Sequence, residues 1–151
     1  MSISDEIILL NNGNIQQKGT PKDLYENPSN IFVARFIGTP EIKTFNTFIE
    51  NGSIKIMNKF IKVNHDKKEI IVGLRTNNIK INNKIGINGK VVSISYHGKN
   101  NLITFNTKEY GYIDVYNDNS YEVGSNHKLT ISKKYIFLFD KKSGKAIKNN
   151  D

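Results

Sequence analysis

The chain reads GTPKDLYENPSNIFVARFIGTP from Gly19 to Pro40. This stretch opens with a helix start: Thr20 is a good N-cap, and Pro21 suits the first helical position because its missing N–H would have no partner there. A second start follows at Asn27-Pro28, and Gly38 can end the helix that comes after it. The spacing therefore predicts two short helices in succession.

A β-hairpin is predicted immediately before these helices. Ile7–Leu10 is an apolar run long enough for a buried strand, and Asn14–Lys18 can return alongside it. Between them lies Asn12-Gly13, a pair that tolerates the positive φ angles of a tight turn. The second helix carries an apolar stripe. Its members are Ile31, Phe32, Val33, Phe36 and Ile37.

These signals occur in the order NNGxIQQxGTPxxLYxNPxNxFVAxFIGTP. The pattern resembles the segment where the nucleotide-binding domain of a sugar-importing ABC ATPase ends and its C-terminal accessory domain begins. The resemblance implies that residues 1–40 are the C-terminal remnant of such a domain. It also implies that residues 41–151 form a transport-associated OB-fold domain.

From Ile42 onward, short β-branched and aromatic runs alternate with Gly, Asn and Asp. Many short strands separated by such turn residues predict an antiparallel barrel or sandwich. One hairpin is expected to run from Thr44 to Met57 around Asn51-Gly52. With the resemblance, the prediction is a mainly β fold: an OB-like barrel (transport-associated OB domain) preceded by the hairpin and the two helices.

Two later stretches are also similar to the accessory domain. Ile71–Ile79 resembles the family's Gly-Leu-Arg-Pro-Glu-Asp-Ile motif, although Thr-Asn-Asn replaces Pro-Glu-Asp, and Ile136–Ile147 resembles its closing hlFDxxTGxxI. The matching positions singled out are Gly73, Leu74, Arg75, Phe139, Asp140 and Gly144. The resemblance implies a structural or regulatory role for them. The residues themselves allow a simpler interpretation, in which Arg75 is packed or paired at the end of a strand.

The chemistry of ATP hydrolysis has no candidate residues in this sequence. No Gly-x-x-x-x-Gly-Lys-Ser/Thr loop, no Leu-Ser-Gly-Gly-Gln signature and no strand ending in paired acids occurs. Three histidines, His65, His97 and His127, lack the spacing of metal ligands. We therefore expect no enzyme activity and no catalytic, cofactor-binding or metal-binding residue. ATP and Mg²⁺ are expected only for the full-length parent, which the resemblance implies is an ABC-type ATPase.

The composition excludes several classes of function. The chain has 151 residues, a formal net charge of +8 and no cysteine, which excludes disulfides and thiolate chemistry. No apolar stretch approaches membrane-spanning length. Arg35 and Arg75 are the only arginines, and the lysines are spread along the predicted strands. This favours solvated strand faces over a specific nucleic-acid site, where arginine clusters are typical.

Two functions stay open. The first is the accessory and regulatory C-terminal domain of the ATP-binding subunit of a bacterial ABC importer for sugars or related small solutes, serving dimerisation and regulation. The resemblance then implies a cytoplasmic position at the inner face of the cell membrane, with the transporter's membrane subunits and a regulatory protein as partners. The second is a free-standing OB-type module that binds nucleic acid or a small anion.

The N-terminal segment also predicts self-association. A lone two-stranded hairpin is marginal in water, and each large apolar side chain left exposed forfeits about 1.5–3 kcal/mol. A homodimer would cover these side chains. The expected association surface consists of Ile7, Ile8, Leu9, Leu10, Phe32 and Phe36. The alternative is that this segment folds back on its own barrel or frays.

Overall fold

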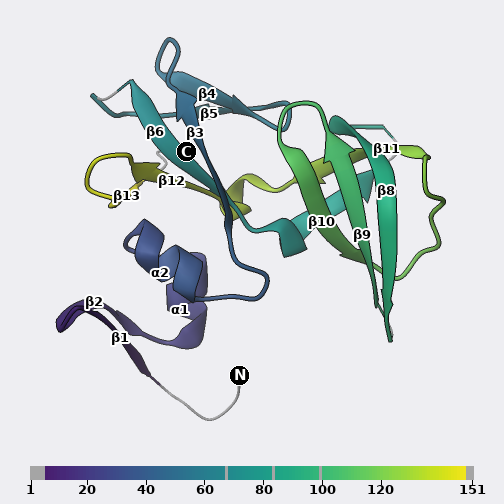
Figure 1. Ribbon diagram of the computed structural model, residues 1–151. Coiled ribbons are helices and arrows are strands. Elements are labelled where there is room, and N and C mark those ends of the chain that lie inside the picture. The colour runs from purple at the N-terminus through teal and green to yellow at the C-terminus, as the bar shows by residue number, and fades with distance from the viewer. Residues whose placement is uncertain (1–5, 67, 83, 99, 149–151) are drawn as a thin grey trace. The chain divides into compact units, whose positions relative to one another are not determined.

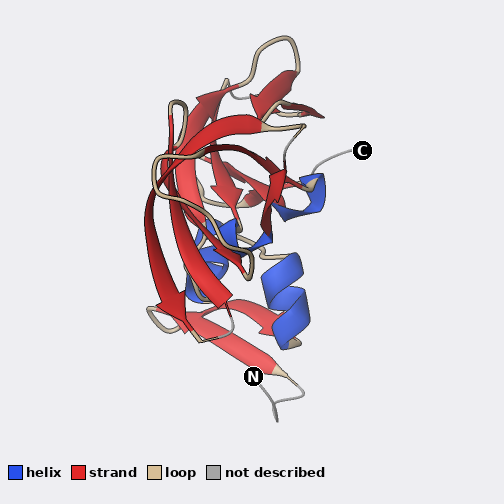
Figure 2. Ribbon diagram, turned by 90° about the vertical axis from the view of Figure 1, so that its right-hand side faces the viewer, coloured by secondary structure: helices blue, strands red, loops and turns tan. Residues whose placement is uncertain are grey.

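Antiparallel β structure dominates the computed structural model, which describes residues 6–66, 68–82, 84–98 and 100–148 (Figure 1). The predicted mainly β fold is confirmed, and Figure 2 shows only short helical segments among the strands. Among the described residues, the structure contains no candidate for a membrane-spanning helix. The chain divides into two compact units. The first unit combines the chain up to Ile54 with Phe60–Arg75 and the chain from Lys134; the second unit combines Lys55–Lys59 with Thr76–Lys133.

The first unit contains a hairpin, two α-helices and a four-stranded sheet. Its elements are β1 (Ile7–Asn11), β2 (Asn14–Gly19), α1 (Pro21–Glu26), α2 (Ile31–Phe36), β3 (Lys43–Phe48), β6 (Glu69–Leu74), β12 (Ile136–Asp140) and β13 (Ala146–Ile147). β1 pairs with β2, and the sheet has the antiparallel order β13-β12-β6-β3. A short 3₁₀ turn, η2 (Lys133–Tyr135), precedes β12.

The predicted start of the first helix at Thr20-Pro21 is confirmed, whereas the start predicted at Asn27-Pro28 is wrong: Asn27 ends α1, and α2 begins only after Asn30. The Thr20 hydroxyl accepts the backbone N–H of Asp23 at 3.1 Å, and the Asp23 carboxylate accepts the backbone N–H of Thr20 at 3.2 Å, which completes a capping box. Asn30 caps α2 by accepting the backbone N–H of Val33 at 2.9 Å. The turn at Asn12-Gly13 has φ angles of 48° and 77° and joins β1 to β2 as expected.

The second unit is built on a five-stranded antiparallel sheet of order β10-β9-β8-β11-β7. Its elements are η1 (Thr76–Asn78), β7 (Ile79–Asn82), β8 (Ile87–His97), β9 (Asn100–Thr107), β10 (Gly111–Asn117) and β11 (Asn126–Ile131). β8, β9 and β10 run side by side in Figure 1, and β10 at one edge also contacts β7 at the other. The sheet therefore curls toward closure, consistent with an OB-like barrel.

The hairpin predicted around Asn51-Gly52 is wrong. β3 pairs with β6, and only an isolated bridge between Glu50 and Ser53 spans that turn. β4 (Ser53–Ile56) pairs instead with β5 (Lys59–Lys62) across Met57-Asn58, whose φ angles are 46° and 65°. Methionine is not a typical residue of such a turn, so no local signal marked this position.

Candidate functional site

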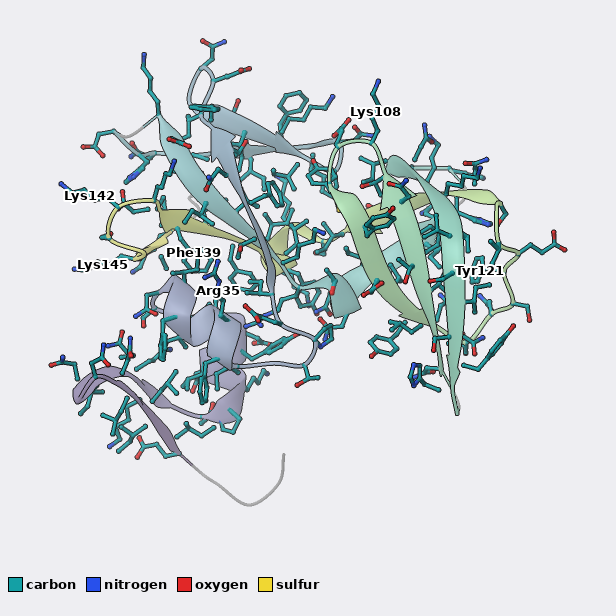
Figure 3. All side chains as sticks on the ribbon, viewed as in Figure 1. Arg35, Lys108, Tyr121, Phe139, Lys142 and Lys145 are labelled. Carbon is teal, nitrogen blue, oxygen red and sulfur yellow. The ribbon has the colours of Figure 1, made fainter. Side chains whose placement is uncertain are left out.

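Three of the six motif positions, Arg75, Phe139 and Gly144, contact helix α2 or the residues that cap it, and a fourth, Gly73, lies against Phe139. Gly73 lies on β6, Arg75 directly follows this strand, Phe139 lies on β12, and Gly144 lies in the turn between β12 and β13. Phe139 and Ala34 of α2 belong to one buried cluster, and Figure 3 shows Phe139 on the side of β12 toward α2. We call the set of Gly73, Arg75, Phe139 and Gly144 the α2 cradle.

Arg75 binds the C-terminal end of α2 through its guanidinium group. Nη1 donates to the backbone oxygens of Ala34 at 2.8 Å and Ile37 at 2.6 Å. Nη2 donates to the backbone oxygen of Tyr25, near the end of α1, at 3.4 Å. The last carbonyls of a helix have no partner within the helix and carry partial negative charge. One cation therefore closes the ends of both helices.

The guanidinium group of Arg75 is almost completely enclosed by other protein groups. Arg75 is 1% exposed, and its Cζ lies 4.3 Å from the ring centroid of Tyr25 and 5.7 Å from that of Phe137. Burial lowers the pKa of Arg75, but arginine ordinarily titrates so far above neutrality that it stays charged. Among the described residues, Nε has no hydrogen-bond partner and no carboxylate pairs with the group. Carbonyl dipoles and aromatic rings thus stabilise the charge.

Two glycines leave the space that these contacts need. A Cβ atom on Gly73 would lie 2.7 Å from Cδ1 of Ile42 and 3.2 Å from the ring of Phe139. Gly38 has a φ of +113°, and a Cβ atom there would lie 2.9 Å from Nη1 of Arg75. A larger residue at Gly73 would force Ile42 and Phe139 to move, and one at Gly38 would force Arg75 to move.

The opposite end of α2 is held by the turn between β12 and β13. The backbone N–H of Ile31 donates to the backbone oxygen of Gly144 at 2.9 Å, and the backbone N–H of Ala146 donates to that of Ser29 at 2.9 Å. The first N–H groups of a helix also lack partners within the helix. The turn and Arg75 therefore satisfy backbone groups at both ends of α2.

Asp140 organises the same turn. Its Oδ1 accepts the backbone N–H of Ser143 at 2.6 Å, the hydroxyl of Ser143 at 2.8 Å and the backbone N–H of Lys142 at 3.1 Å, while Oδ2 lies 3.1 Å from Nε2 of His65. These bonds, led by the backbone N–H of Ser143, lower the pKa of Asp140 from 3.8 to about 2. Leu74, the remaining motif position, is fully buried on β6.

We expect Asp140→Asn to destabilise the protein at neutral pH and to flatten its stability in acid. The folded-state pKa of Asp140 lies below the unfolded value, so its contribution is complete above about pH 4 and is lost as pH falls through about 2. Thermal melts between neutral pH and about pH 2 measure the effect. The Tm of Asp140→Asn should be lower than that of the wild type at neutral pH, and the two Tm values should converge near pH 2. Asp118→Asn, at an exposed position, is the control. The same pH dependence in Asp140→Asn and the wild type would contradict the prediction.

Part of the expected association surface is buried within the first unit. Leu9 of β1 forms a core cluster with Leu24 of α1, Val33 of α2 and Ile37, which directly follows α2. The partly buried side chains around this cluster are Ile7, Tyr25 and Phe32. Leu9 therefore lies in the core of the first unit and not on an exposed association surface, and the hairpin and α1 cover Val33 and Ile37 of the apolar stripe. The side of α2 that carries Ala34 packs on the four-stranded sheet.

Other side chains of that surface are exposed. Ile8 and Leu10 are 53% and 56% exposed on the face of β1 that points away from Leu9. Ile15, which pairs with Leu10 across the hairpin, is 65% exposed and was not expected. We call Ile8, Leu10 and Ile15 the hairpin face. Phe36 is also exposed, at the end of α2.

Potential metal ligands do not cluster in the part of the chain that the structure describes. No group of three potential metal ligands gathers among those residues. His65 contacts Asp140, whereas His97 and His127 contact serine hydroxyls on or next to their own strands. What the α2 cradle can do is hold a helix at both ends against a sheet.

Comparison with known proteins finds relatives among ATP-binding proteins of importers, although no family model matches the chain. The chain is 32% identical over 130 residues to the spermidine/putrescine import ATP-binding protein PotA of Mycoplasma mycoides, a match that covers 82% of the chain and 37% of that protein. It is 28% identical over 160 residues to the sn-glycerol-3-phosphate import ATP-binding protein UgpC of Psychromonas ingrahamii, with 97% and 43% covered. It is 37% identical over 90 residues to the oligosaccharides import ATP-binding protein MsmX of Bacillus subtilis, with 52% and 25% covered. The chain thus spans less than half the length of these relatives.

Proposed function

Because this chain belongs to the family of ABC transporter ATP-binding proteins, we propose that it is the accessory C-terminal region of an importer's ATP-binding subunit. Its role is to tether and regulate paired subunits at the inner face of the cell membrane, beside the transporter's membrane subunits. The relatives named above differ in their cargo, and the cargo proposed here is a sugar or a related small solute. ATP and Mg²⁺ bind to the other part of the subunit.

The α2 cradle is the observation that supports this role best. In the proposed subunit, α1 and α2 are the end of the ATP-binding domain, and residues 41–151 are the accessory domain. Arg75 and Gly144 of the accessory domain bind the two ends of α2. A displacement of this helix would therefore be passed to the four-stranded sheet. An accessory domain attached in this way can follow or restrain the opening and closing of its ATPase domain.

A chimera tests the proposed role. The region of UgpC that matches this chain is replaced by the chain, and both ATP hydrolysis and sn-glycerol-3-phosphate import are measured. We expect the chimera to hydrolyse ATP and to import, and we expect Arg75→Met in the chimera to reduce import more than hydrolysis. A folded chimera in which Arg75→Met changes neither rate would argue against the role of the α2 cradle.

The isolated chain should not bind nucleotide, because the phosphate-binding loop of the subunit lies outside it in this proposal. Calorimetric titration with Mg-ATP is the direct measurement, and we expect no heat of binding. A titration of UgpC under the same conditions serves as the positive control. Saturable micromolar binding of Mg-ATP to the isolated chain would contradict the proposal that nucleotide binds only to the other part of the subunit.

We also propose that the chain forms a homodimer through the hairpin face. Ile8, Leu10 and Ile15 lie on a two-stranded sheet, which is marginal when solvated. Since burying each large apolar side chain contributes about 1.5–3 kcal/mol, Ile8→Thr with Leu10→Thr should weaken association at least about tenfold in sedimentation experiments. Phe48→Thr, which removes an equally exposed side chain of β3, is the control. Monomeric wild-type protein, or equal weakening by the control, would contradict this interface.

A second candidate function, binding of nucleic acid or a small anion, is favoured by one specific observation. Lysine side chains gather on the outer face of the five-stranded sheet in the second unit.

A further inference from the structure

The outer face of the five-stranded sheet is polar and rich in lysine. Along its strands, inward side chains such as Val91, Phe105 and Leu129 are buried, and their neighbours in the chain are exposed or partly exposed. The outward residues include one lysine from each of three adjacent strands. They are Lys80 of β7, Lys128 of β11 and Lys90 of β8. The expectation of lysines merely dispersed along the strands does not hold for this face.

Strand register places these three lysines on one diagonal. Lys80 pairs with Thr130, two residues after Lys128 on β11. Lys90 pairs with Asn126, two residues before Lys128. Diagonal neighbours on adjacent strands lie about 7–8 Å apart. The three side chains therefore form an evenly stepped row across β7, β11 and β8, which we call the lysine diagonal.

The row continues with polar and aromatic side chains. Asn106 of β9 pairs with Lys90, and Tyr112 of β10 pairs with Asn106. Tyr112 is 64% exposed. Nζ of Lys128 donates to Oδ1 of Asn88 at 3.0 Å, and none of the three lysines forms an ion pair with a described residue. Their positive charges are therefore available to a partner.

A pocket of about 200 Å³ adjoins the row at Lys128. Lys108, on the connection between β9 and β10, also lines this pocket and projects outward in Figure 3. Asn58 and Asn88 add amide groups to the lining, and Glu109 adds one carboxylate. A fourth ammonium group thus stands close to the lysine diagonal.

We propose that the lysine diagonal binds the phosphate backbone of a single-stranded nucleic acid and that one base stacks on Tyr112. A stepped row of cations suits a linear polyanion, which gains affinity by releasing its counterions. An aromatic side chain at the end of such a row offers the stacking surface that single-stranded segments use. Lysine lacks the fork with which arginine reads base edges, so the binding is independent of sequence.

Other anionic partners fit this face less well. A docked acidic polypeptide would bury apolar side chains at the centre of its interface, whereas asparagine and threonine lie between the lysines. A flat anionic membrane would engage exposed lysines whatever their order and would gain nothing from the diagonal spacing. Asp114 lies two residues after Tyr112 on the same face and accepts a hydrogen bond from the hydroxyl of Thr104 at 2.7 Å. Its negative charge marks the end of the face that can attract an anion.

Fluorescence anisotropy with a labelled oligouridine of about 20 nucleotides tests this proposal on the whole chain. Three or four neutralised phosphates predict a slope of log affinity against log salt of about −2 to −3. The triple variant Lys80→Gln, Lys90→Gln, Lys128→Gln should bind at least about tenfold more weakly, with a slope shallower than about −1. Tyr112→Ala should weaken binding at least about fivefold and leave the slope unchanged, because stacking is insensitive to salt.

A second triple variant controls for net charge. Lys62→Gln, Lys142→Gln and Lys145→Gln remove the same charge from exposed positions of the first unit, and we expect binding within about twofold of the wild type. Equal losses in the two triple variants would overturn the proposal. Inorganic polyphosphate, polyglutamate and vesicles containing anionic lipid are measured in parallel. If any of them binds as tightly as oligouridine and Tyr112→Ala has no effect, the partner is not a nucleic acid.

Discussion

Replacing Arg75 by alanine is expected to lower the free energy of unfolding by about 3–5 kcal/mol. The change removes the donors to the backbone oxygens of Ala34 and Ile37, and each buried acceptor left without a partner costs about 1–3 kcal/mol. It also empties the space beside the rings of Tyr25 and Phe137, which adds the cost of a cavity. Urea unfolding of the chain measures the difference.

Two further substitutions separate the charge of Arg75 from its hydrogen bonds. Arg75→Met keeps much of the volume and removes both charge and donors, and we expect a loss of about 2–3 kcal/mol, since relief of a buried charge offsets part of the lost bonding. Arg75→Lys keeps the charge but not the planar fork that reaches three carbonyls, so it should also destabilise the protein. If Arg75→Met is as stable as the wild type, the bonds to the helix ends contribute nothing.

Arg35 offers a matched control for this series. Its Nη2 donates to the hydroxyl of Thr44 at 2.9 Å, its Nε lies 3.8 Å from a carboxylate oxygen of Glu41, and half of its side chain is exposed (Figure 3). Solvated interactions of this kind contribute little, so Arg35→Ala should cost less than about 1 kcal/mol. Hydrogen exchange adds a local test. In Arg75→Met the amides of α2 should exchange faster, whereas those of β9 and β11 in the second unit should not change.

Features with a local cause could be predicted from the sequence. The capping residue Thr20, the turn at Asn12-Gly13 and the alternation along the later strands each depend on a few neighbouring side chains, and all are present in the structure. The mainly β fold follows from the same short-range signals. The motif positions were identified by resemblance, but their meeting at α2 was not, because that requires the pairing of β6 with β12.

Features with a distant cause could not be predicted. The acceptors of Arg75 are backbone carbonyls of α1 and α2, and every residue carries a carbonyl, so no sequence pattern marks them. The sequence analysis interpreted Arg75 as a residue packed or paired at the end of a strand. Its burial is confirmed, but the sequence did not identify the carbonyl groups that it binds. The lysine diagonal likewise exists only because β11, which is distant in the chain, pairs with both β7 and β8 in this register.

Replacing Gly86 by alanine is expected to destabilise the second unit by at least about 3 kcal/mol. Gly86 has a φ of +134°, and a Cβ atom there would collide with the backbone oxygen of Leu129 and lie 2.6 Å from its carbonyl carbon. Leu129 is fully buried on β11 and pairs with Ile87 of β8 and Ile81 of β7. Its backbone cannot retreat without weakening the pairing on both sides. Urea unfolding measures the loss.

Gly111→Ala separates this collision from the cost of the backbone conformation alone. Gly111 also has a positive φ, +64°, but no atom lies within 4 Å of the Cβ position, so alanine there should cost only about 1–2 kcal/mol. The difference between the two variants then measures the clash with Leu129. Gly86→Ala should also weaken oligouridine binding, because a shift of β8 against β11 moves Lys90 away from the row set by Lys128. Equal stability of the two variants would mean that β8 and β11 do not approach so closely in solution.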